Sequence, residues 1–255
     1  MTQLDIVIPV YNEAHVLAGS VEQLRGYLQD SGFPYTWRIV IADNASTDGT
    51  LAAAHSLEDR FDDVAALHLP QKGRGRALRK AWLESEADAA CFMDVDLSTD
   101  LDALLPLARA VLEEGYDVAT GSRMTRGSQI TRSLRREITS RGLITLIKLL
   151  FWSKLSDTQC GFKAITRQAA RELVPRIENE EWFFDTELLL LAEKGGYRVK
   201  DVPVRWIEDT DTRVNVVKTV LEDLSGLLRM RLRRIPRRVD EPSLETASYP
   251  YSNPS

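Results

Sequence analysis

The chain has 255 residues, a hydrophobic fraction of 44% and a formal net charge of −5 at pH 7, which is the composition of an ordinary globular protein. It is long enough to bury a sizeable core. Its two cysteines, Cys91 and Cys160, exclude a disulfide framework, and its three histidines stand apart from any partner at metal-ligand spacing.

Predicted strands alternate with predicted helices through the first half of the chain. Strands are predicted at residues 4–10, 37–42, 64–69, 87–93 and 117–120, and helices at 17–28, 51–57 and from Leu101 onward. This alternation predicts an α/β fold with a mostly parallel sheet that is covered by helices on both faces.

Acidic residues follow three of the predicted strands. Glu13 follows the first strand, Asp43 the second, and Asp94 and Asp96 the fourth. In open α/β sheets, ligands bind beyond the carboxyl ends of the strands. The sequence therefore predicts a site at this edge of the sheet.

The pair Asp94 and Asp96 has the spacing i, i+2 at a strand end, so both carboxylates can point the same way. Such a pair repels itself unless a cation lies between its members, and an all-oxygen pair suits Mg²⁺ or Mn²⁺. The alternative is that these residues cap the helix that starts near Leu101. Asp100 is the better cap, because Asp94 and Asp96 lie too far upstream.

A basic, glycine-containing segment, KGRGR at residues 72–76, lies between the third and fourth strands. Backbone N–H groups at a helix start attract anions, so the segment can hold a diphosphate. A solvated loop is an equally good interpretation. The segment is not a P-loop, because the Lys-[Ser/Thr] ending is missing.

Two arginine clusters occur in the second half of the chain. The first contains Arg123, Arg126, Arg132, Arg135, Arg136 and Arg141 and precedes the apolar stretch 143–152; the second contains Arg229, Arg231, Arg233, Arg234, Arg237 and Arg238, at the end of a predicted helix over 214–232. Both favour a phosphate-rich membrane surface, although basic helix ends are also common as plain solvated faces. Nucleic acid is disfavoured, since no reading motif is present.

No apolar run reaches the roughly 18 residues of a membrane span, and the first strand begins without a signal peptide before it. We therefore expect a protein that is soluble or peripheral to a membrane. Residues 1–235 are expected to form one domain, and the proline-containing segment 236–255 a disordered tail.

Five motifs together carry a resemblance. They are PVYNE at 9–13, DNASTDG at 43–49, DVD at 94–96, GSR at 121–123 and DTQCGFK at 157–163. The set resembles family 2 glycosyltransferases of the GT-A fold, especially the polyprenyl (dolichyl) phosphate sugar synthases. Within these, DTQCGFK and the later WFFDTEL at 182–188 look most like dolichyl-phosphate glucose synthases.

The resemblance implies a role for each matching residue. The donor nucleotide sugar would be held by Pro9, Tyr11, Glu13, Asp43, Lys72, Asp94, Val95, Asp96 and Arg213. Mg²⁺ or Mn²⁺ would lie on Asp94 and Asp96, and the acceptor phosphate on Arg123, Arg132 and Arg136. Asp157, together with Asp96, would be catalytic. The structural alternative for Asp157 is a turn or helix cap before Gly161.

The implied reaction is the attack of a lipid phosphate oxygen on the anomeric carbon of a nucleotide sugar, with inversion. The acceptor phosphate has a second pKa of about 6 and needs little help from a base, so Asp157 either removes a proton or orients the nucleophile. We expect glucose transfer from UDP-glucose to a polyprenyl or dolichyl phosphate by a cytoplasmic enzyme that is peripheral at the cytoplasmic face of a membrane. The sequence leaves the oligomeric state open.

Three alternatives stay open. The same reaction can use mannose from GDP-mannose, or an N-acetylhexosamine donor. A scaffold that binds a nucleotide sugar without turnover would share the motifs. A haloacid-dehalogenase-like phosphatase also has a D-x-D motif at a strand end, but that fold normally opens with this strand, whereas here three strands precede it.

Overall fold

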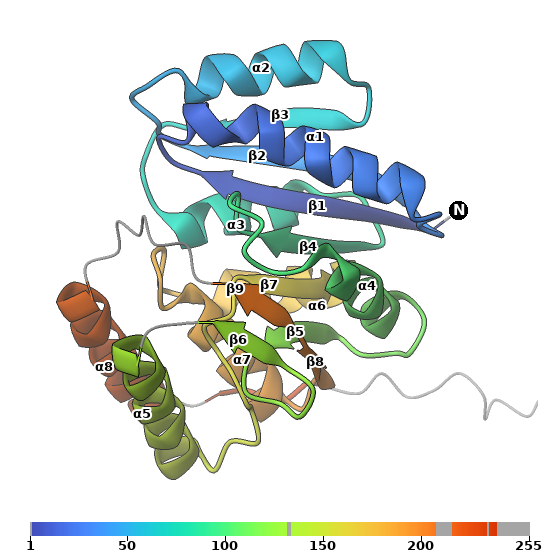
Figure 1. Ribbon diagram of the computed structural model, residues 1–255. Coiled ribbons are helices and arrows are strands. Elements are labelled where there is room, and N and C mark those ends of the chain that lie inside the picture. Colours follow the sequence, from blue (N-terminus) through green and yellow to red (C-terminus); the bar gives the residue numbers. More distant parts are fainter. Residues whose placement is uncertain (1, 132–133, 208–215, 234, 239–255) are drawn as a thin grey trace, which may run out of the picture.

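The computed structural model describes residues 2–131, 134–207, 216–233 and 235–238; for residues 130–131, 134–139 and 216–218 it describes the backbone alone. Figure 1 shows an open sheet with helices on both faces. Two long helices, α5 and α8, lie side by side beyond the second half of the sheet.

The main sheet has seven strands in the order β3-β2-β1-β4-β7-β5-β8. Their bounds are β1 Gln3–Val10, β2 Thr36–Asn44, β3 Val64–Leu69, β4 Ala89–Met93, β5 Val118–Ser122, β7 Phe162–Thr166 and β8 Val199–Pro203. All neighbouring pairs are parallel except those of β7, which runs antiparallel between β4 and β5. A small parallel sheet pairs β6 (Gln129–Thr131) with β9 (Arg205–Ile207).

The helices are α1 Ala14–Asp30, α2 Thr50–Arg60, α3 Arg74–Glu84, α4 Leu104–Leu112, α5 Leu134–Phe151, α6 Arg167–Leu173, α7 Phe184–Gly195 and α8 Val216–Leu232. Short 3-10 turns, Leu101–Ala103 and Val174–Arg176, precede α4 and follow α6.

Side-chain alternation along the strands builds two hydrophobic cores. On β1, Leu4, Ile6 and Ile8 face the core under α1, α2 and α4, whereas Val7 faces the core shared with α3, α6 and α7. Successive side chains of a strand point to opposite faces, so a nearly continuous apolar run is what a strand buried on both faces requires. The α/β fold with a mostly parallel sheet is confirmed.

The antiparallel strand β7 was not predicted, and it decides the layout of the site. Its register places Phe162 opposite Met93, the last residue of β4. The DTQCGFK motif therefore lies beside the loop that carries Asp94 and Asp96. The helix predicted from Leu101 begins instead as a 3-10 turn, with Asp100 as its cap: the Asp100 side chain accepts a hydrogen bond from the Asp102 N–H.

Candidate active site

Hydrogen bonds join the loops that follow β1 and β2. The Thr47 N–H donates to Asn12 Oδ1 over 2.8 Å, and the Asn12 N–H donates to Ser46 Oγ over 3.0 Å. The Glu13 N–H donates to Thr50 Oγ1 over 2.8 Å. These contacts fix the first two predicted donor-binding loops against each other.

Three non-glycine residues at this edge of the sheet have positive φ angles. They are Asn12 after β1 (57°), Ala45 after β2 (58°) and Leu97 after β4 (49°). The left-handed region is costly for residues with a Cβ, and such strain gathers at functional sites. The strained turns follow the same three strands whose ends carry the acidic residues.

Asp43 is fully buried at the end of β2. His68 Nδ1 lies 2.7 Å from Asp43 Oδ2, while Asp43 Oδ1 has no hydrogen-bond partner among the described residues. A buried acceptor without a partner is costly, and a ligand N–H would satisfy it. The neighbouring Tyr11 ring lies under the Lys72 ammonium, whose Nζ is 3.3 Å from the ring centroid.

The KGRGR segment is packed against the protein and does not form an open anion cradle. The Gly73 N–H donates to Asn44 Oδ1 over 2.6 Å, and the Arg76 N–H donates to the Glu180 carbonyl over 3.1 Å. Arg74 is buried, and Arg76 pairs with the Glu180 side chain. Of the three basic residues in this segment, only Lys72 is exposed.

Asp94 and Asp96 occupy the loop after β4. Asp96 Oδ1 accepts a hydrogen bond from the Ser98 N–H (2.9 Å), and Asp94 Oδ1 accepts one from Arg74 Nη2 (3.2 Å). The side chain of Val95 between them is buried in the core, so the predicted donor contact of Val95 would be made by its backbone. Asp94 packs against Gly161, and only glycine allows this, because a Cβ at position 161 would lie 1.9 Å from Asp94 Oδ2.

The environment of Asp94 favours a cation. Burial raises the pKa of Asp94; the Arg74 guanidinium opposes this rise, and the charge of Asp96 adds to it. Two carboxylates with oxygen donors only fit Mg²⁺ or Mn²⁺. Within the part of the chain that the structure describes, no cluster of three or more His, Cys, Asp or Glu side chains forms a metal cage, so ligand and water oxygens would complete the coordination.

Arg123, after β5, and Asp157, before β7, form a bidentate ion pair. Arg123 Nε lies 2.7 Å from Asp157 Oδ2, and Nη2 lies 3.0 Å from Oδ1. Burial alone would raise the pKa of Asp157, but the charge and hydrogen bonds of Arg123 hold it below its ordinary value. Asp157 is therefore a carboxylate at neutral pH and a weak base. Arg123, the predicted acceptor ligand, thus uses both its Nε and its Nη2 to bind Asp157.

The two parts of the site lie close together, because β7 pairs with both β4 and β5 and because Gly161, just before β7, lies against Asp94. Pro9 lies on β1 beside Ala42, and Glu13 is the N-cap residue of α1. The remaining predicted ligands are not placed: Arg132 and Arg213 lie outside the described residues, and Arg136 is on α5 with its side chain not described.

Sequence comparison gives the family. Residues 5–174 match the profile described as glycosyl transferase family 2. The chain belongs to this family. Glycosyltransferase AglD of Haloferax volcanii is 35% identical over 232 residues, which are 89% of this chain and 36% of AglD. The dolichyl-phosphate beta-glucosyltransferase of Drosophila melanogaster is 32% identical over 81% of this chain and 67% of the fly protein. This chain thus spans about a third of the first relative and two thirds of the second.

Solved structures give the same fold for this family 2 glycosyltransferase. Glucosyl-3-phosphoglycerate synthase from Mycobacterium tuberculosis, crystallised with Mn²⁺, uridine diphosphate and phosphoglyceric acid, superposes with a TM-score of 0.66. The superposition covers 90% of this chain and 78% of the mycobacterial chain, at 17% sequence identity. The expected GT-A fold is confirmed.

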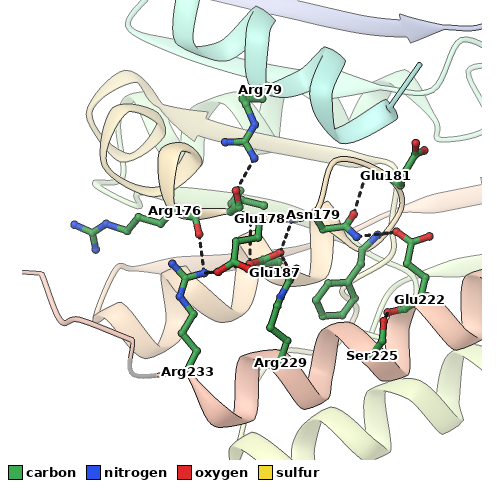
Figure 2. A network of polar contacts seen from close by, with 12 residues as sticks. Arg79, Arg176, Glu178, Asn179, Glu181, Glu187, Glu222, Ser225, Arg229 and Arg233 are labelled. Atoms are coloured by element: carbon green, nitrogen blue, oxygen red, sulfur yellow. Dashed lines mark hydrogen bonds and ion pairs between the residues drawn. The ribbon is translucent and has the colours of Figure 1, made fainter. Parts of the chain in front are cut away.

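Helix α8 of the glycosyltransferase is anchored by a polar network around the buried Glu187, shown in Figure 2. Glu187 accepts hydrogen bonds from the Glu178 and Asn179 N–H groups over 3.1 and 3.0 Å. It also pairs with Arg229 Nη2 at 2.5 Å and Arg233 Nη1 at 3.5 Å. Arg229 and Arg233 of the second arginine cluster therefore form ion pairs within the protein, as Arg238 does with Asp117 at 2.7 Å.

A different part of α8 faces outward. Its exposed side chains include Leu221, Leu224, Leu228 and Leu232, with exposed fractions of 63%, 45%, 63% and 81%. Their spacing places them on one stripe, opposite the buried Leu227 and Met230. On the neighbouring α5, Leu149 is also exposed, and so is Trp152 directly after the helix. Among the described residues, no helix has the length and apolarity that crossing a bilayer needs.

Helix α8 also contacts the loop that carries Asp157. Gln159 Nε2 donates to Asp223 Oδ2 over 2.9 Å, and the Gln159 N–H donates to Asp157 Oδ1 over 3.0 Å. Burial and the charge of Glu222 raise the pKa of Asp223 to about 7, against the effect of its hydrogen bond to Gln159. Hydrogen bonds through Gln159 thus link the Asp157 carboxylate to Asp223 on α8, the helix that carries the outward leucine stripe.

Proposed function

We propose that this glycosyltransferase transfers glucose from UDP-glucose to a polyprenyl or dolichyl phosphate at the cytoplasmic face of a membrane, with inversion at the anomeric carbon. The observation that carries the proposal is the placement of Asp94 and Asp96 beside the Arg123–Asp157 pair by strand β7. Gln159 links that pair to Asp223 on α8, the helix that carries the exposed leucine stripe. The names of the relatives support the lipid phosphate, and the mycobacterial complexes support UDP.

The donor half of the site suits a nucleoside diphosphate sugar. The unpartnered Asp43 Oδ1 is an acceptor for a nucleobase N–H, and Lys72 is exposed beside Tyr11. Asp94 and Asp96 would hold Mg²⁺ or Mn²⁺, which neutralises the charge of a departing diphosphate when it is bound. Pro9, Glu13 and Arg213 complete the proposed donor set.

In the reaction, a phosphate oxygen of the acceptor forms a bond to the anomeric carbon while the bond to the diphosphate oxygen breaks. The nucleoside diphosphate leaves with the electron pair. No proton has to be removed from the nucleophile, because the phosphate is ionised above a pH of about 6. Asp157 then acts as a positioned carboxylate that fixes Arg123 for the acceptor phosphate. Arg132 and Arg136 are the further proposed contacts to that phosphate.

A panel of nucleotide sugars tests the proposal. The protein is incubated with polyprenyl phosphate, Mn²⁺ and, in separate reactions, UDP-glucose, GDP-mannose and UDP-N-acetylglucosamine. We expect β-glucosyl phosphopolyprenol from UDP-glucose, identified by mass spectrometry and by the anomeric proton coupling. Transfer from GDP-mannose alone would replace the donor in the proposal. Nucleotide binding without release of nucleoside diphosphate from any donor would indicate a scaffold.

The membrane contact gives a separate prediction. Replacing Leu224 and Leu228 by Glu should lower the partition coefficient onto anionic vesicles by at least about tenfold, because each leucine contributes on the order of 1 kcal/mol when it is buried in the interface. Vesicle flotation measures the effect. The matched control is Leu83→Glu, at a side chain on α3 that is 37% exposed, which should float like the wild type.

Basic groups on the same side should make this binding salt-sensitive, since charges are screened over about 10 Å at 0.1 M salt. Lys148 on α5 is one such exposed group. Equal flotation of wild type and the double leucine variant would contradict the assignment of this face to the membrane.

A further inference from the structure

The first turn of α7 buries three polar residues in a row: Asp185, Thr186 and Glu187. They belong to the WFFDTEL motif, to which neither the donor nor the acceptor binding described above assigns a role. Burying polar groups costs free energy unless each has a partner. Glu187 holds α8, and the Thr186 hydroxyl donates to Thr158 Oγ1 over 3.1 Å, next to Asp157. Asp185 pairs with Arg74 at the start of α3.

The guanidinium of Arg74 is shared between two carboxylates. Its Nη1 lies 2.5 Å from Asp185 Oδ2, and its Nη2 lies 3.2 Å from Asp94 Oδ1. Charge-assisted hydrogen bonds are strongest at short distance, so the stronger contact is the one to Asp185. Lys163 Nζ, 3.5 Å from Asp185 Oδ1, adds a second positive charge on the far side.

We propose that Asp185 is a positioning residue that holds Arg74 back from Asp94 and thereby keeps Asp94 available to a divalent cation. A guanidinium released from Asp185 would close on Asp94 as a bidentate pair, the geometry that arginine and carboxylate prefer. It would then compete with the cation for the same oxygens. The inference rests on the proposed function in one respect, namely that Asp94 takes a cation.

This arrangement explains why a positive side chain is buried beside a cation site at all. Arg74 is buried at the start of α3, close in the chain to the donor-facing Lys72. Without ligands, its positive charge limits the repulsion among Asp94, Asp96 and Asp185. With Asp185 as its main partner, it does so without occupying both oxygens of Asp94.

The test measures Mn²⁺ binding without turnover. Free Mn²⁺ is titrated by electron paramagnetic resonance with UDP present, for wild type, Asp185→Asn and the double variant Asp185→Asn/Arg74→Gln. Partners that orient metal ligands typically account for 10–100-fold in affinity. We expect Asp185→Asn to weaken Mn²⁺ binding about tenfold, and the double variant to recover most of this loss because the competing guanidinium is gone.

Asp5→Asn is the matched control. Asp5 is another buried carboxylate with a bidentate arginine partner, Arg38 Nη2 at 2.6 Å, but it lies at the start of β1. The Asp5→Asn variant should have a lower melting temperature than the wild type but the same Mn²⁺ affinity. Melting curves of all variants show whether each is folded. If Asp185→Asn does not fold, Asp185→Glu takes its place: it keeps the charge and should bind Mn²⁺ with the affinity of the wild type.

The outcomes separate the inference from the function on which it rests. Unchanged Mn²⁺ affinity in Asp185→Asn, or a double variant that binds no better than Asp185→Asn, overturns the positioning role and leaves the proposed reaction standing. A wild-type protein that binds no Mn²⁺ with UDP present removes the cation from the proposed function, and the inference falls with it.

Discussion

Replacing Asp96 by asparagine should lower the rate of sugar transfer by about a thousandfold or more. The amide side chain of the variant keeps an oxygen that can accept the Ser98 N–H, so the turn after β4 persists while the negative charge is lost. Charge neutralisation by a bound cation supplies several kcal/mol of transition-state stabilisation, and each 1.36 kcal/mol is a factor of ten in rate. The measurement is single-turnover transfer with saturating donor and acceptor.

Asp100→Asn is the control for this change. Asp100 lies four residues further along and caps the 3-10 turn before α4, so its loss should affect stability modestly and the transfer rate little. Excess chelator should abolish wild-type transfer, and added Mn²⁺ should restore it. Full turnover in chelator would remove the cation from the mechanism.

Asp157→Asn should lower the transfer rate by about a hundredfold with little change in nucleotide affinity. Asparagine is neutral and cannot form the ion pair with Arg123, so the guanidinium is no longer fixed. Misplacement of a positioning group by about 1 Å lowers the rate roughly a hundredfold. Asp157→Ala leaves the largely buried Arg123 guanidinium without its carboxylate and should also cost about 3–5 kcal/mol of stability. Chemical denaturation measures the second effect.

The pH dependence separates positioning from base catalysis. The pKa of Asp157 is held below its ordinary value, so the stability that it contributes is present above the unfolded-state pKa and is lost as the pH falls through the folded-state pKa. No ionisation of Asp157 then falls between pH 6 and 8. We expect the rate to rise with pH near 6, where the acceptor phosphate ionises, and this rise should remain in Asp157→Asn. Its disappearance in the variant would make Asp157 the base.

Strand ends are where the sequence was most informative about the site. Apolar runs that stop at Asp43 and at Asp94 indicate both the strand and the direction in which its polar end faces, because parallel strands share their carboxyl edge. The structure brings these carboxylates to one edge as predicted. The positive φ angles at Asn12, Ala45 and Leu97 mark the same turns, yet they left no glycine signal by which the sequence could have shown them.

Charge patterns were less reliable, because an arginine's role depends on what lies opposite it. Arg229 and Arg233 look like a basic helix end in the sequence, and in the structure they face the buried Glu187 from another helix. For Arg123, a predicted phosphate ligand, the sequence did not indicate the pairing with Asp157, which lies 34 residues away. Only the structure shows that the leucine stripe of α8 is exposed, because it shows which face of the helix is buried.

The sequence by itself determined the α/β alternation, the edge of the sheet that carries the site and the carboxylates that can hold a cation. These follow from local periodicity and from the chemistry of single side chains. Only the tertiary structure decided which charges meet. The Arg74–Asp185 contact spans 111 residues, and the antiparallel β7 brings Gly161 against Asp94. The physical reason is that the pairing of a buried charge is set by the packing of distant elements, which leaves no periodic trace along the chain.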